Sequence, residues 1–357
     1  MKPEEFELYL TNRKASVVDA LQKIDKNSKG LLFVINEEFI LEGVITDGDI
    51  RRWLIRTGEL HGAVENFMNT QPCVMHNKNI DDAIKIMDEK KITALPVVDD
   101  DGKLYDIIFY NKPSKPKTIN QDVLKNVPVV IMAGGKGTRL YPYTKILPKP
   151  LIPIGDIPIM ERIITRFNDA GITEFYATVN YRANMIKSYF SELQKNYRLN
   201  YVDEEQPLGT AGSLRLINKL FESPIIVTNC DILINADYSA IYNYHLESGN
   251  ELTIVSALKN ITVPYGVLSS GKNGNVERID EKPQLSYFIN TGMYLLNSQL
   301  IKEIPENKFF HMTDLIDRLM KEGRTVGMYP ISEDSFLDMG EFEEMHRMEQ
   351  KLNLKSE

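Results

Sequence analysis

The segment VVIMAGGKGTRLYPYTKILPKPLIPIG, residues 129–155, decides how the rest of the chain is interpreted. It begins with a short apolar run, residues 129–132, whose length predicts a buried strand. Three glycines in the next few positions predict a loop whose backbone can approach a ligand closely. Backbone N–H groups in such a loop can hold phosphate oxygens, and Lys136, Arg139 and Lys149 add positive charge. The loop is not a Walker A motif, which needs Lys followed by Ser or Thr after the last glycine. It is not a G-x-G-x-x-G motif either, because Leu140 occupies the position of the third glycine.

Size and composition restrict the class of protein. The chain has 357 residues, 43% of them hydrophobic, and a net charge of −8. This length predicts two or three domains, and the negative charge argues against coating nucleic acid. The N-terminus lacks the shape of a signal peptide, and no apolar run is long enough to span a bilayer. Two cysteines are too few for a disulfide framework, so we expect a cytoplasmic protein without a membrane partner.

An internal repeat occupies the first third of the chain. Asp19 and Val34 match Asp82 and Val97, and the segment that begins at Gly43 lies over the one that begins at residue 106. All pairings share one offset, so each copy predicts a helix, a strand, a turn and a second strand. We expect one copy in residues 1–60, the other in 61–118, a linker in 119–127 and a larger domain in 128–357.

Strand-like and helix-like patterns alternate from residue 128 onward. The expected strands are residues 129–132, 175–179, 199–202, 225–228 and 252–257, and the expected helices include 159–170 and 183–189. This alternation predicts an α/β domain with a mainly parallel sheet covered by helices. In such sheets ligands bind beyond the carboxyl ends of the strands, which is where the glycine loop falls.

The motifs from the glycine loop to about residue 345 resemble, in order, those of sugar-1-phosphate nucleotidyltransferases. The N-terminal repeat resembles a tandem cystathionine-beta-synthase-type (CBS) module, with GVITDGDI at residues 43–50 as its best marker. The resemblance implies a Rossmann-like, mainly parallel nucleotidyltransferase domain preceded by an α+β CBS pair. It also implies attack by a sugar 1-phosphate oxygen on the α-phosphate of a nucleoside triphosphate.

That reaction needs two anions aligned and the charge at phosphorus stabilised. On the resemblance, Arg139 and Lys149 are the catalytic cations, and Mg²⁺ is held by Asp231 and Asp338. A lone aspartate at such a position more often ends a strand or caps a helix. The nucleotide-binding loop residues are Ala133, Gly134, Gly135, Gly137 and Thr138.

The segment EEQPLGTAG, residues 204–212, is similar to the base-binding loop of guanylyltransferases. A carboxylate suits guanine because it can accept from both N1–H and the exocyclic amine. The residues leave open whether Glu205 or Gln206 faces the base, and Glu204 is compatible with an acidic surface turn. The expected base-binding residues are Glu205, Gly209 and Thr210, with GTP as the nucleotide.

The sugar phosphate is assigned to later segments by the same resemblance. Its residues are Gly266, Glu281, Lys282, Asn290 and Thr291. In the CBS pair, Thr46 and Asp49 are expected to bind a regulatory purine nucleotide, or else only to cap the following helix. CBS pairs also favour a homodimer.

The fusion of these parts resembles bacterial CBS-bearing guanylyltransferases of nonulosonic (legionaminic-type) acid pathways. Glucosamine 1-phosphate is therefore the first expected acceptor, followed by mannose 1-phosphate or a heptose 1-phosphate. Three alternatives stay open: uridylyl or thymidylyl transfer, glycosyl transfer, and a nucleotide-sensing regulator with a silent transferase domain. His311 is expected to precede a helix and to have no catalytic role.

Overall fold

The computed structural model describes residues 6–27, 29–60, 62–110, 121–219 and 221–352. The chain divides into two compact units: residues 1–117 with 258–287, and residues 118–257 with 288–357. Of the expected linker, residues 119–127, the first two residues lie outside the described part of the chain. A short helix, α5 (Gln121–Leu124), precedes the first strand of the second unit.

The predicted repeat is confirmed in the first unit. One helix and two strands of the first copy recur in the second copy 63 positions later: α2 (Val17–Asn27) and α4 (Ile80–Lys90), β2 (Leu31–Ile35) and β4 (Ala94–Val98), β3 (Leu41–Thr46) and β5 (Leu104–Phe109). Even the irregularity in strand pairing recurs, at Val34/Ile35 and again at Val97/Val98. The two copies are therefore the same supersecondary unit repeated without insertion.

The two copies share a hydrophobic core. Phe33 and Leu31 of the first copy pack with Ala94, Val98 and Ile107 of the second. Two elements have no counterpart among the described residues of the second copy: β1 (Leu10–Thr11), which pairs in parallel with β2, and α3 (Asp47–Thr57), which follows β3. Burial of both inner faces in one cluster explains why a single copy would not suffice.

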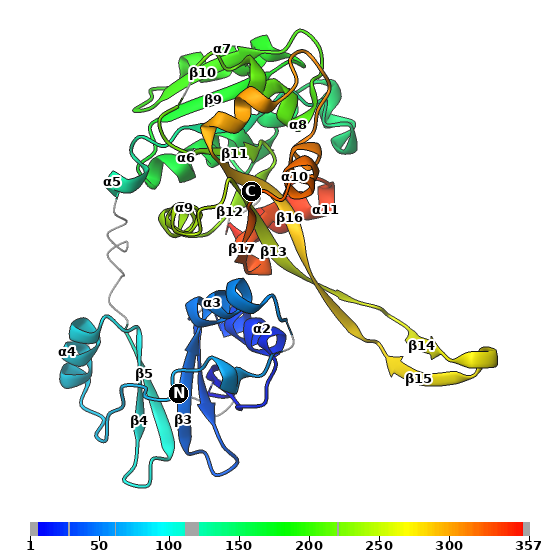
Figure 1. Ribbon diagram of the computed structural model, residues 1–357. Helices are drawn as coiled ribbons and strands as arrows, with labels where there is room; N and C mark the ends of the chain where they lie inside the picture. Colours follow the sequence, from blue (N-terminus) through cyan, green and yellow to red (C-terminus); the bar gives the residue numbers. More distant parts are fainter. Residues whose placement is uncertain (1–5, 28, 61, 111–120, 220, 353–357) are drawn as a thin grey trace. The chain divides into compact units, whose positions relative to one another are not determined.

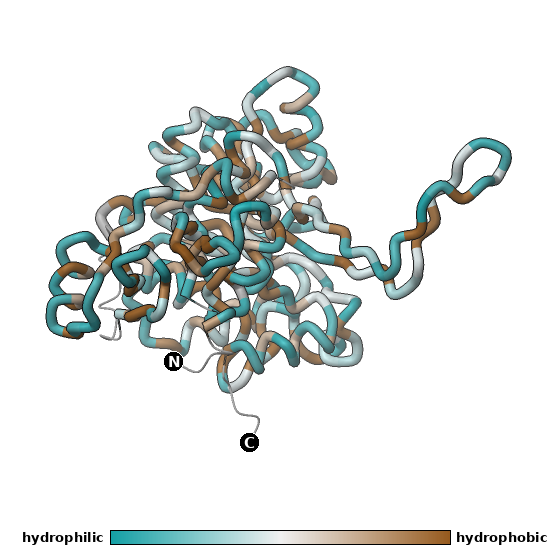
Figure 2. Tube along the Cα trace, turned by 90° about the horizontal axis from the view of Figure 1, so that it is seen from below, coloured by the Kyte–Doolittle hydropathy of each residue, from teal (hydrophilic) through white to brown (hydrophobic). Residues whose placement is uncertain are grey.

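A two-stranded hairpin completes the first unit. It consists of β14 (Gly266–Ser270) and β15 (Val276–Glu281), seen in yellow in Figure 1. Every residue of β14 is exposed, and the hairpin carries both hydrophobic and hydrophilic residues below a hydrophilic tip (Figure 2).

A seven-stranded sheet forms the centre of the second unit, in the order β10-β9-β6-β11-β16-β13-β17 (Figure 1). Its strands are β6 (Val129–Met132), β9 (Glu174–Val179), β10 (Arg198–Asp203), β11 (Ile225–Asn229), β13 (Leu252–Thr262), β16 (Gln284–Leu296) and β17 (Val326–Ile331). The pairs among β10, β9, β6 and β11 are parallel, whereas β16 pairs antiparallel to β11. The expected mainly parallel α/β sheet is confirmed.

Helices and short strands surround this sheet. They are α6 (Ile159–Asp169), α7 (Ala183–Glu192), α8 (Gly209–Gly212), α9 (Tyr238–Glu247), α10 (Met312–Lys321), α11 (Phe342–Lys351), and the strand pairs β7 (Pro153–Ile154) with β8 (Ile157–Pro158) and β12 (Ile232–Ile234) with β18 (Phe336–Asp338). None of the helices in the described ranges is long and apolar enough to cross a membrane.

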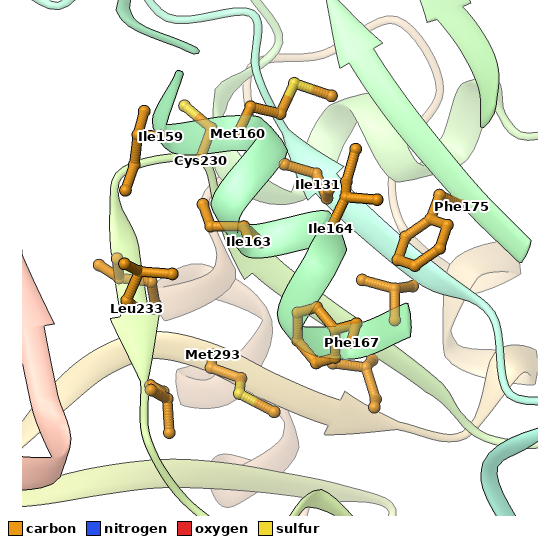
Figure 3. Packing of buried hydrophobic residues seen from close by; sticks show 14 of the residues in the cluster. Ile131, Ile159, Met160, Ile163, Ile164, Phe167, Phe175, Cys230, Leu233 and Met293 are labelled. Atoms are coloured by element: carbon orange, nitrogen blue, oxygen red, sulfur yellow. The ribbon is translucent and has the colours of Figure 1, made fainter. Parts of the chain in front are cut away.

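Apolar residues at helical spacing hold α6 against the sheet. Ile159, Ile163, Ile164 and Phe167 recur every three or four positions, so they occupy one face of the helix. Figure 3 shows them packed with Ile131 of β6 and with other residues of the same cluster. This packing fixes the position of β6, and with it the start of the glycine loop.

The order of the strands places their ends in a row. The carboxyl ends of β10, β9, β6 and β11 lie at one edge of the sheet, because these neighbouring strands are parallel. The outer two are separated by three strand spacings, or about 14 Å. An extended nucleotide can therefore lie across this edge.

Candidate functional site

The glycine loop leaves the sheet at a buried position. Ala133 is fully buried, and its N–H donates to the Thr178 carbonyl at 2.9 Å. Gly137 has φ +63°, and a Cβ there would lie 2.9 Å from Cγ2 of Thr144 and 3.0 Å from Cβ of Lys149. Glycine is therefore required at residue 137, where the loop folds back against its own continuation.

Lys149 is the buried cation of the site. It begins a short 3₁₀ helix, residues 149–151, and its side chain is only 10% exposed. Its Nζ forms an ion pair with Oδ2 of Asp231, whose side chain is 12% exposed. A buried charge of this kind needs a partner or a ligand, so the two groups hold each other in place.

Asp231 and Asp338 lie side by side because β12 and β18 pair antiparallel. Ile232 is opposite Asp338, and the Met339 N–H donates to the Asp231 carbonyl at 2.8 Å. Burial raises the pKa of Asp338, and the Asp231 charge raises it further, while Lys149 and Arg139 oppose the shift. Two carboxylates that repel each other beside a pocket fit a divalent cation, since Mg²⁺ commonly takes one or two protein carboxylates plus phosphate and water oxygens.

Arg139 is close to the same carboxylates. Its side chain is exposed, and a Cβ built on Gly340 would lie 3.3 Å from its Nη1 and 3.2 Å from Oδ2 of Asp338. Gly340 thus leaves room for the guanidinium beside the aspartate pair. Lys136, the other cation of the glycine loop, is exposed and does not line the pocket, and the same is true of Lys145.

A pocket of about 350 Å³ lies along this edge of the sheet. Nine of the predicted site residues line it: Gly134, Gly135, Gly137, Thr138, Arg139, Lys149, Gly209, Thr210 and Asp231. They come from the loops after β6 and β11 and from the start of α8, so residues predicted from separate motifs are brought together. Ala133 and Asp338 do not line the pocket: Ala133 lies in the chain between two residues that do, and Asp338 is paired with Ile232, the residue after Asp231.

Of the two neighbouring glutamates in the predicted base loop, Glu204 lines the pocket and Glu205 does not. Glu205 is exposed and does not line the pocket, whereas Glu204 does and is only partly accessible. Burial raises the pKa of Glu204, and a hydrogen bond from the Leu208 N–H to Oε2 at 3.3 Å opposes the shift. The Glu204 N–H donates to the Val179 carbonyl at 2.9 Å, which holds the residue in line with β9 and turns its side chain inward.

Asn180 supports this arrangement. Its Nδ2 donates to the Glu204 carbonyl at 2.6 Å, so the end of β9 and the base loop are tied together. The neighbouring Tyr181 hydroxyl donates to the Thr144 carbonyl at 3.0 Å, and Arg182 Nη2 donates to the Lys145 carbonyl at 2.7 Å. These bonds fix the segment between Arg139 and Lys149 from outside the pocket.

Sequence reasoning missed several pocket residues. They are Met132, Thr178, Glu204, Pro207, Ser213, Asn229, Cys230 and Phe309. Asn229 directly precedes the Cys230-Asp231 pair and contacts Gly292, where a Cβ would collide with its side-chain amide. Burial raises the pKa of Cys230 to about 12, so it is a neutral packing residue. The position of Asn229 at the end of a predicted strand could have identified it as a site residue from the sequence. Phe309 lies in a loop far away in the sequence and belongs to no motif, so it could not.

Asn290 and Thr291 have internal partners in β16. The Thr291 hydroxyl is buried and donates to the Val255 carbonyl at 2.7 Å. Asn290 Oδ1 accepts from the Gly292 N–H at 2.9 Å, and its Nδ2 donates to the Tyr294 hydroxyl at 2.8 Å. Both residues therefore shape the strand beside Asn229.

The other predicted sugar residues lie together on the hairpin of the first unit. Gly266 is opposite Glu281 in the strand pairing, and a Cβ at Gly266 would lie 3.0 Å from Oε2 of Glu281. Lys282 follows with φ +47°. All three are exposed, so they are available to a ligand.

Thr46 and Asp49 form a capping box at the start of α3. The Thr46 hydroxyl donates to Oδ2 of Asp49 at 2.6 Å and accepts from the Asp49 N–H at 3.2 Å. Oδ1 of Asp49 pairs with Arg52, and Asp47 pairs with Arg51. The capping role is thus present, and a hollow of about 870 Å³ in this unit does not include these residues.

His311 directly precedes α10, as expected. Its N–H donates to Oδ2 of Asp314 at 2.7 Å, which caps the helix. Its ring Nδ1 lies 3.4 Å from the Thr210 N–H and hydroxyl. This contact joins the start of α10 to the base loop.

Comparisons with known proteins agree with this geometry. A family model described as Nucleotidyl transferase matches residues 128–354, and one described as CBS domain matches residues 8–56 and 64–109. A mannose-1-phosphate guanyltransferase of Aspergillus fumigatus is 36% identical over 186 residues, 49% of this chain and 50% of that protein. A UTP–glucose-1-phosphate uridylyltransferase of Synechocystis sp. is 32% identical over 232 residues, 59% of each chain.

The chain spans about half the length of most of the curated relatives it matches. Among solved structures, HddC from Yersinia pseudotuberculosis is 29% identical with a TM-score of 0.51. That match covers 63% of this chain and 99% of the other. A second structure of HddC, complexed with GMP-PN, is 28% identical with the same TM-score.

Proposed function

Because the chain belongs to the nucleotidyl transferase family, we propose that it transfers a nucleotidyl group from a nucleoside triphosphate to a sugar 1-phosphate. The observation that carries the proposal is the pocket at the sheet edge, where the glycine loop, Arg139, the Lys149–Asp231 pair and Glu204 converge. The relatives support it, since those compared are named as transferases of this kind.

The reaction forms one bond and breaks one at the α-phosphorus. An oxygen of the sugar 1-phosphate attacks, and pyrophosphate leaves with the bridging oxygen and its electron pair. The glycine-loop N–H groups and Arg139 hold phosphate oxygens, while Lys149 places a buried positive charge beside the reacting phosphate. No protein nucleophile is needed, because the sugar phosphate is itself the nucleophile.

Asp231 and Asp338 would hold Mg²⁺, and the ion would neutralise charge on the triphosphate and stabilise the leaving group. Burial and, second, the Asp231 charge raise the pKa of Asp338, and a cation held between the two carboxylates would offset both effects. Lys149 then has a second role, because its ion pair with Asp231 orients that carboxylate.

We assign the donor as GTP and Glu204 as the residue that recognises guanine. A partly buried carboxylate can accept from both N1–H and the exocyclic amine, and only guanine among the common bases offers that pair of donors. The support comes from the pocket position of Glu204, from relatives named as guanyltransferases and from a neighbour solved with GMP-PN. Glu205, which the sequence favoured, is replaced in this assignment because its side chain is exposed.

Glucosamine 1-phosphate remains the first-choice acceptor on the resemblance to CBS-bearing guanylyltransferases of nonulosonic acid pathways. Mannose 1-phosphate is the sugar named in several relatives, and a heptose 1-phosphate comes next. Gly266, Glu281 and Lys282 stay assigned to the sugar phosphate, with Asn290 and Thr291 as supporting residues of β16. We further propose a cytoplasmic homodimer whose CBS pair responds to a purine nucleotide.

The test crosses four nucleoside triphosphates with a panel of sugar 1-phosphates and measures pyrophosphate release with Mg²⁺. Turnover with GTP and glucosamine 1-phosphate supports the full proposal. Turnover with UTP or dTTP would keep the reaction and overturn the guanine assignment. Silence in every combination, repeated with adenine and guanine nucleotides added as activators, would overturn the transferase proposal.

A matched pair of variants tests the role of Glu204. Glu204→Gln should reduce the preference for GTP over UTP by about tenfold to a hundredfold, since it replaces one acceptor of a charged hydrogen-bonded pair by a donor. Glu205→Gln is the control, because its side chain lies outside the pocket lining. Equal effects of the two substitutions would contradict the assignment.

A further inference from the structure

Phe309 is an aromatic side chain left exposed in the pocket at the sheet edge. Its side chain is 63% exposed, and it lines the pocket together with Glu204, Pro207 and Gly209. A phenyl ring makes no conventional hydrogen bond, so hydrogen bonding does not explain why this ring is exposed. Exposed aromatic rings in a ligand pocket are commonly contact surfaces for a flat ligand group.

The backbone that follows Phe309 is fixed against the base loop. The Phe310 N–H donates to the Leu208 carbonyl at 2.8 Å, and the Phe310 carbonyl accepts from the Ala211 and Gly212 N–H groups at 3.0 and 2.9 Å. The Met312 N–H donates to the Thr210 hydroxyl at 3.0 Å. The ring is therefore held at the end of the pocket where Glu204 lies.

Two glycines make this close approach possible. A Cβ at Gly209 would lie 2.6 Å from the Phe310 carbonyl oxygen, and one at Gly212 would lie 2.8 Å from that of Lys308. Gly209 also has φ +80°, which side chains rarely adopt. The loop that precedes α8 and the segment that precedes α10 thus form one support for the ring.

The ring keeps a free face. It meets the His311 ring edge-to-face, with centroids 4.7 Å apart and planes at 82°, which covers at most one face of Phe309. Asp231 and its partner Lys149 lie toward β11, three strand spacings from the end of β10 that leads into Glu204. The part of a nucleotide nearest Phe309 is consequently the base.

We infer that Phe309 stacks on the base of the bound nucleotide and supplies affinity, while Glu204 supplies the choice between bases. The inference rests on the proposed function, because it assigns a further contact within the same pocket. Stacking uses the flat aromatic face, which every base has, so its contribution to affinity depends little on which base is bound. The ring and the carboxylate therefore act separately, one on affinity for all four nucleotides and one on selectivity.

The test uses the full chain with Phe309→Ala, Phe309→Leu and Phe309→Trp. Alanine and leucine should raise the KM for GTP about five- to tenfold, and tryptophan should leave it within about twofold of the parent value. The KM for the sugar 1-phosphate and the melting temperature should not change. Leu246→Ala, which removes another exposed apolar side chain, is the control.

A direct binding measurement separates this inference from the proposed reaction. The natural chain has one tryptophan, so Phe309→Trp adds a single new fluorophore. GTP should change the emission of this variant beyond any change in the parent, whereas inorganic triphosphate, which lacks a base, should not. An unchanged KM for GTP in Phe309→Ala, or emission from Phe309→Trp that does not respond to GTP, would overturn the inference. If the parent chain shows no turnover, the fluorescence result still decides whether a base stacks on this ring.

Discussion

Asp231 and Asp338, the carboxylates of the proposed metal site, differ in their surroundings. Asp231 is paired with buried Lys149, whereas Asp338 has a raised pKa from burial and from the Asp231 charge. Asp231→Asn leaves the lysine charge buried without its partner, so it should cost about 3–5 kcal/mol of stability. Asp338→Asn removes a repelling charge and should leave the melting temperature unchanged or higher.

Both substitutions should also reduce magnesium-dependent turnover by at least about a hundredfold. Thermal unfolding without metal measures the change in stability, and steady-state rates with Mg²⁺ measure the change in turnover. Asp334→Asn is the control, because it removes an exposed partner of Lys351 and should change little. Near-normal rates in either site variant would remove that residue from the site.

Two neighbouring glycines of the loop provide a second test at this scale. A Cβ at Gly134 would lie 2.6 Å from Oε1 of Glu204, whereas a Cβ at Gly135 would meet nothing within 4 Å. Gly134→Ala should lower stability by about 1 kcal/mol and alter GTP selectivity, since the Glu204 carboxylate must move. Gly135→Ala should leave the melting temperature unchanged and raise the KM for GTP, because its methyl group obstructs the phosphates alone. Equal melting temperatures for the two variants would show that Glu204 moves aside without cost.

Residues close together in sequence were the predictable part of the site. The glycine loop, Arg139 and the strand before them form one continuous sequence pattern. The constant offset of 63 positions predicted the helix and strands of each repeat without an insertion. The choice between Glu204 and Glu205 depends on how a loop turns after β10, which no local pattern determines. The hydrogen bonds of Phe310 and Met312 that place Phe309 beside the base loop join segments about a hundred residues apart, so only the folded chain reveals them.

The packing of α9 on β13 contains a histidine that should be sensitive to pH. His245 is buried, with Nδ1 2.8 Å from the Thr253 hydroxyl and Nε2 3.4 Å from Oδ1 of Asn297. Burial lowers the pKa of His245, and the Asn297 contact opposes the shift. The unfolded chain therefore takes up this proton more readily, and stability is lost as the pH falls below about 6.5.

The expected loss from His245 is about 1 kcal/mol between pH 6.5 and 5.5. His245→Gln should lower stability at pH 7.5 but show a smaller further loss across that interval. Denaturant midpoints of the two proteins at several pH values measure the difference, and groups such as Glu204 and Asp338 cancel because both proteins contain them. Parallel pH profiles would show that His245 is protonated without cost in the folded chain.

At the scale of the whole molecule, the proposed nucleotide response of the CBS pair would make transferase activity depend on a second ligand. Thr46 and Asp49 already satisfy each other in the capping box of α3. A nucleotide that uses the same hydroxyl and carboxylate must replace those bonds, so binding there would change the start of α3. Coupling between distinct sites is typically worth about 1–3 kcal/mol, which corresponds to about fivefold or more in affinity.

AMP is the best ligand for testing this regulation, because it should act at the CBS pair and not as a donor substrate. It has no pyrophosphate to release and lacks the two hydrogen-bond donors that Glu204 would recognise. With GTP and the sugar 1-phosphate held below saturation, AMP should change the turnover of the whole chain severalfold and raise its melting temperature. Thr46→Ala combined with Asp49→Ala should abolish both responses, at a cost of about 1–2 kcal/mol from the lost cap. Asn79→Ala is the matched control, because Asn79 caps α4 in the same unit and lies outside the proposed contact. Loss of the AMP response in the control as well would assign it to general weakening of the unit, and an unchanged response in the Thr46 and Asp49 variant would place the nucleotide elsewhere.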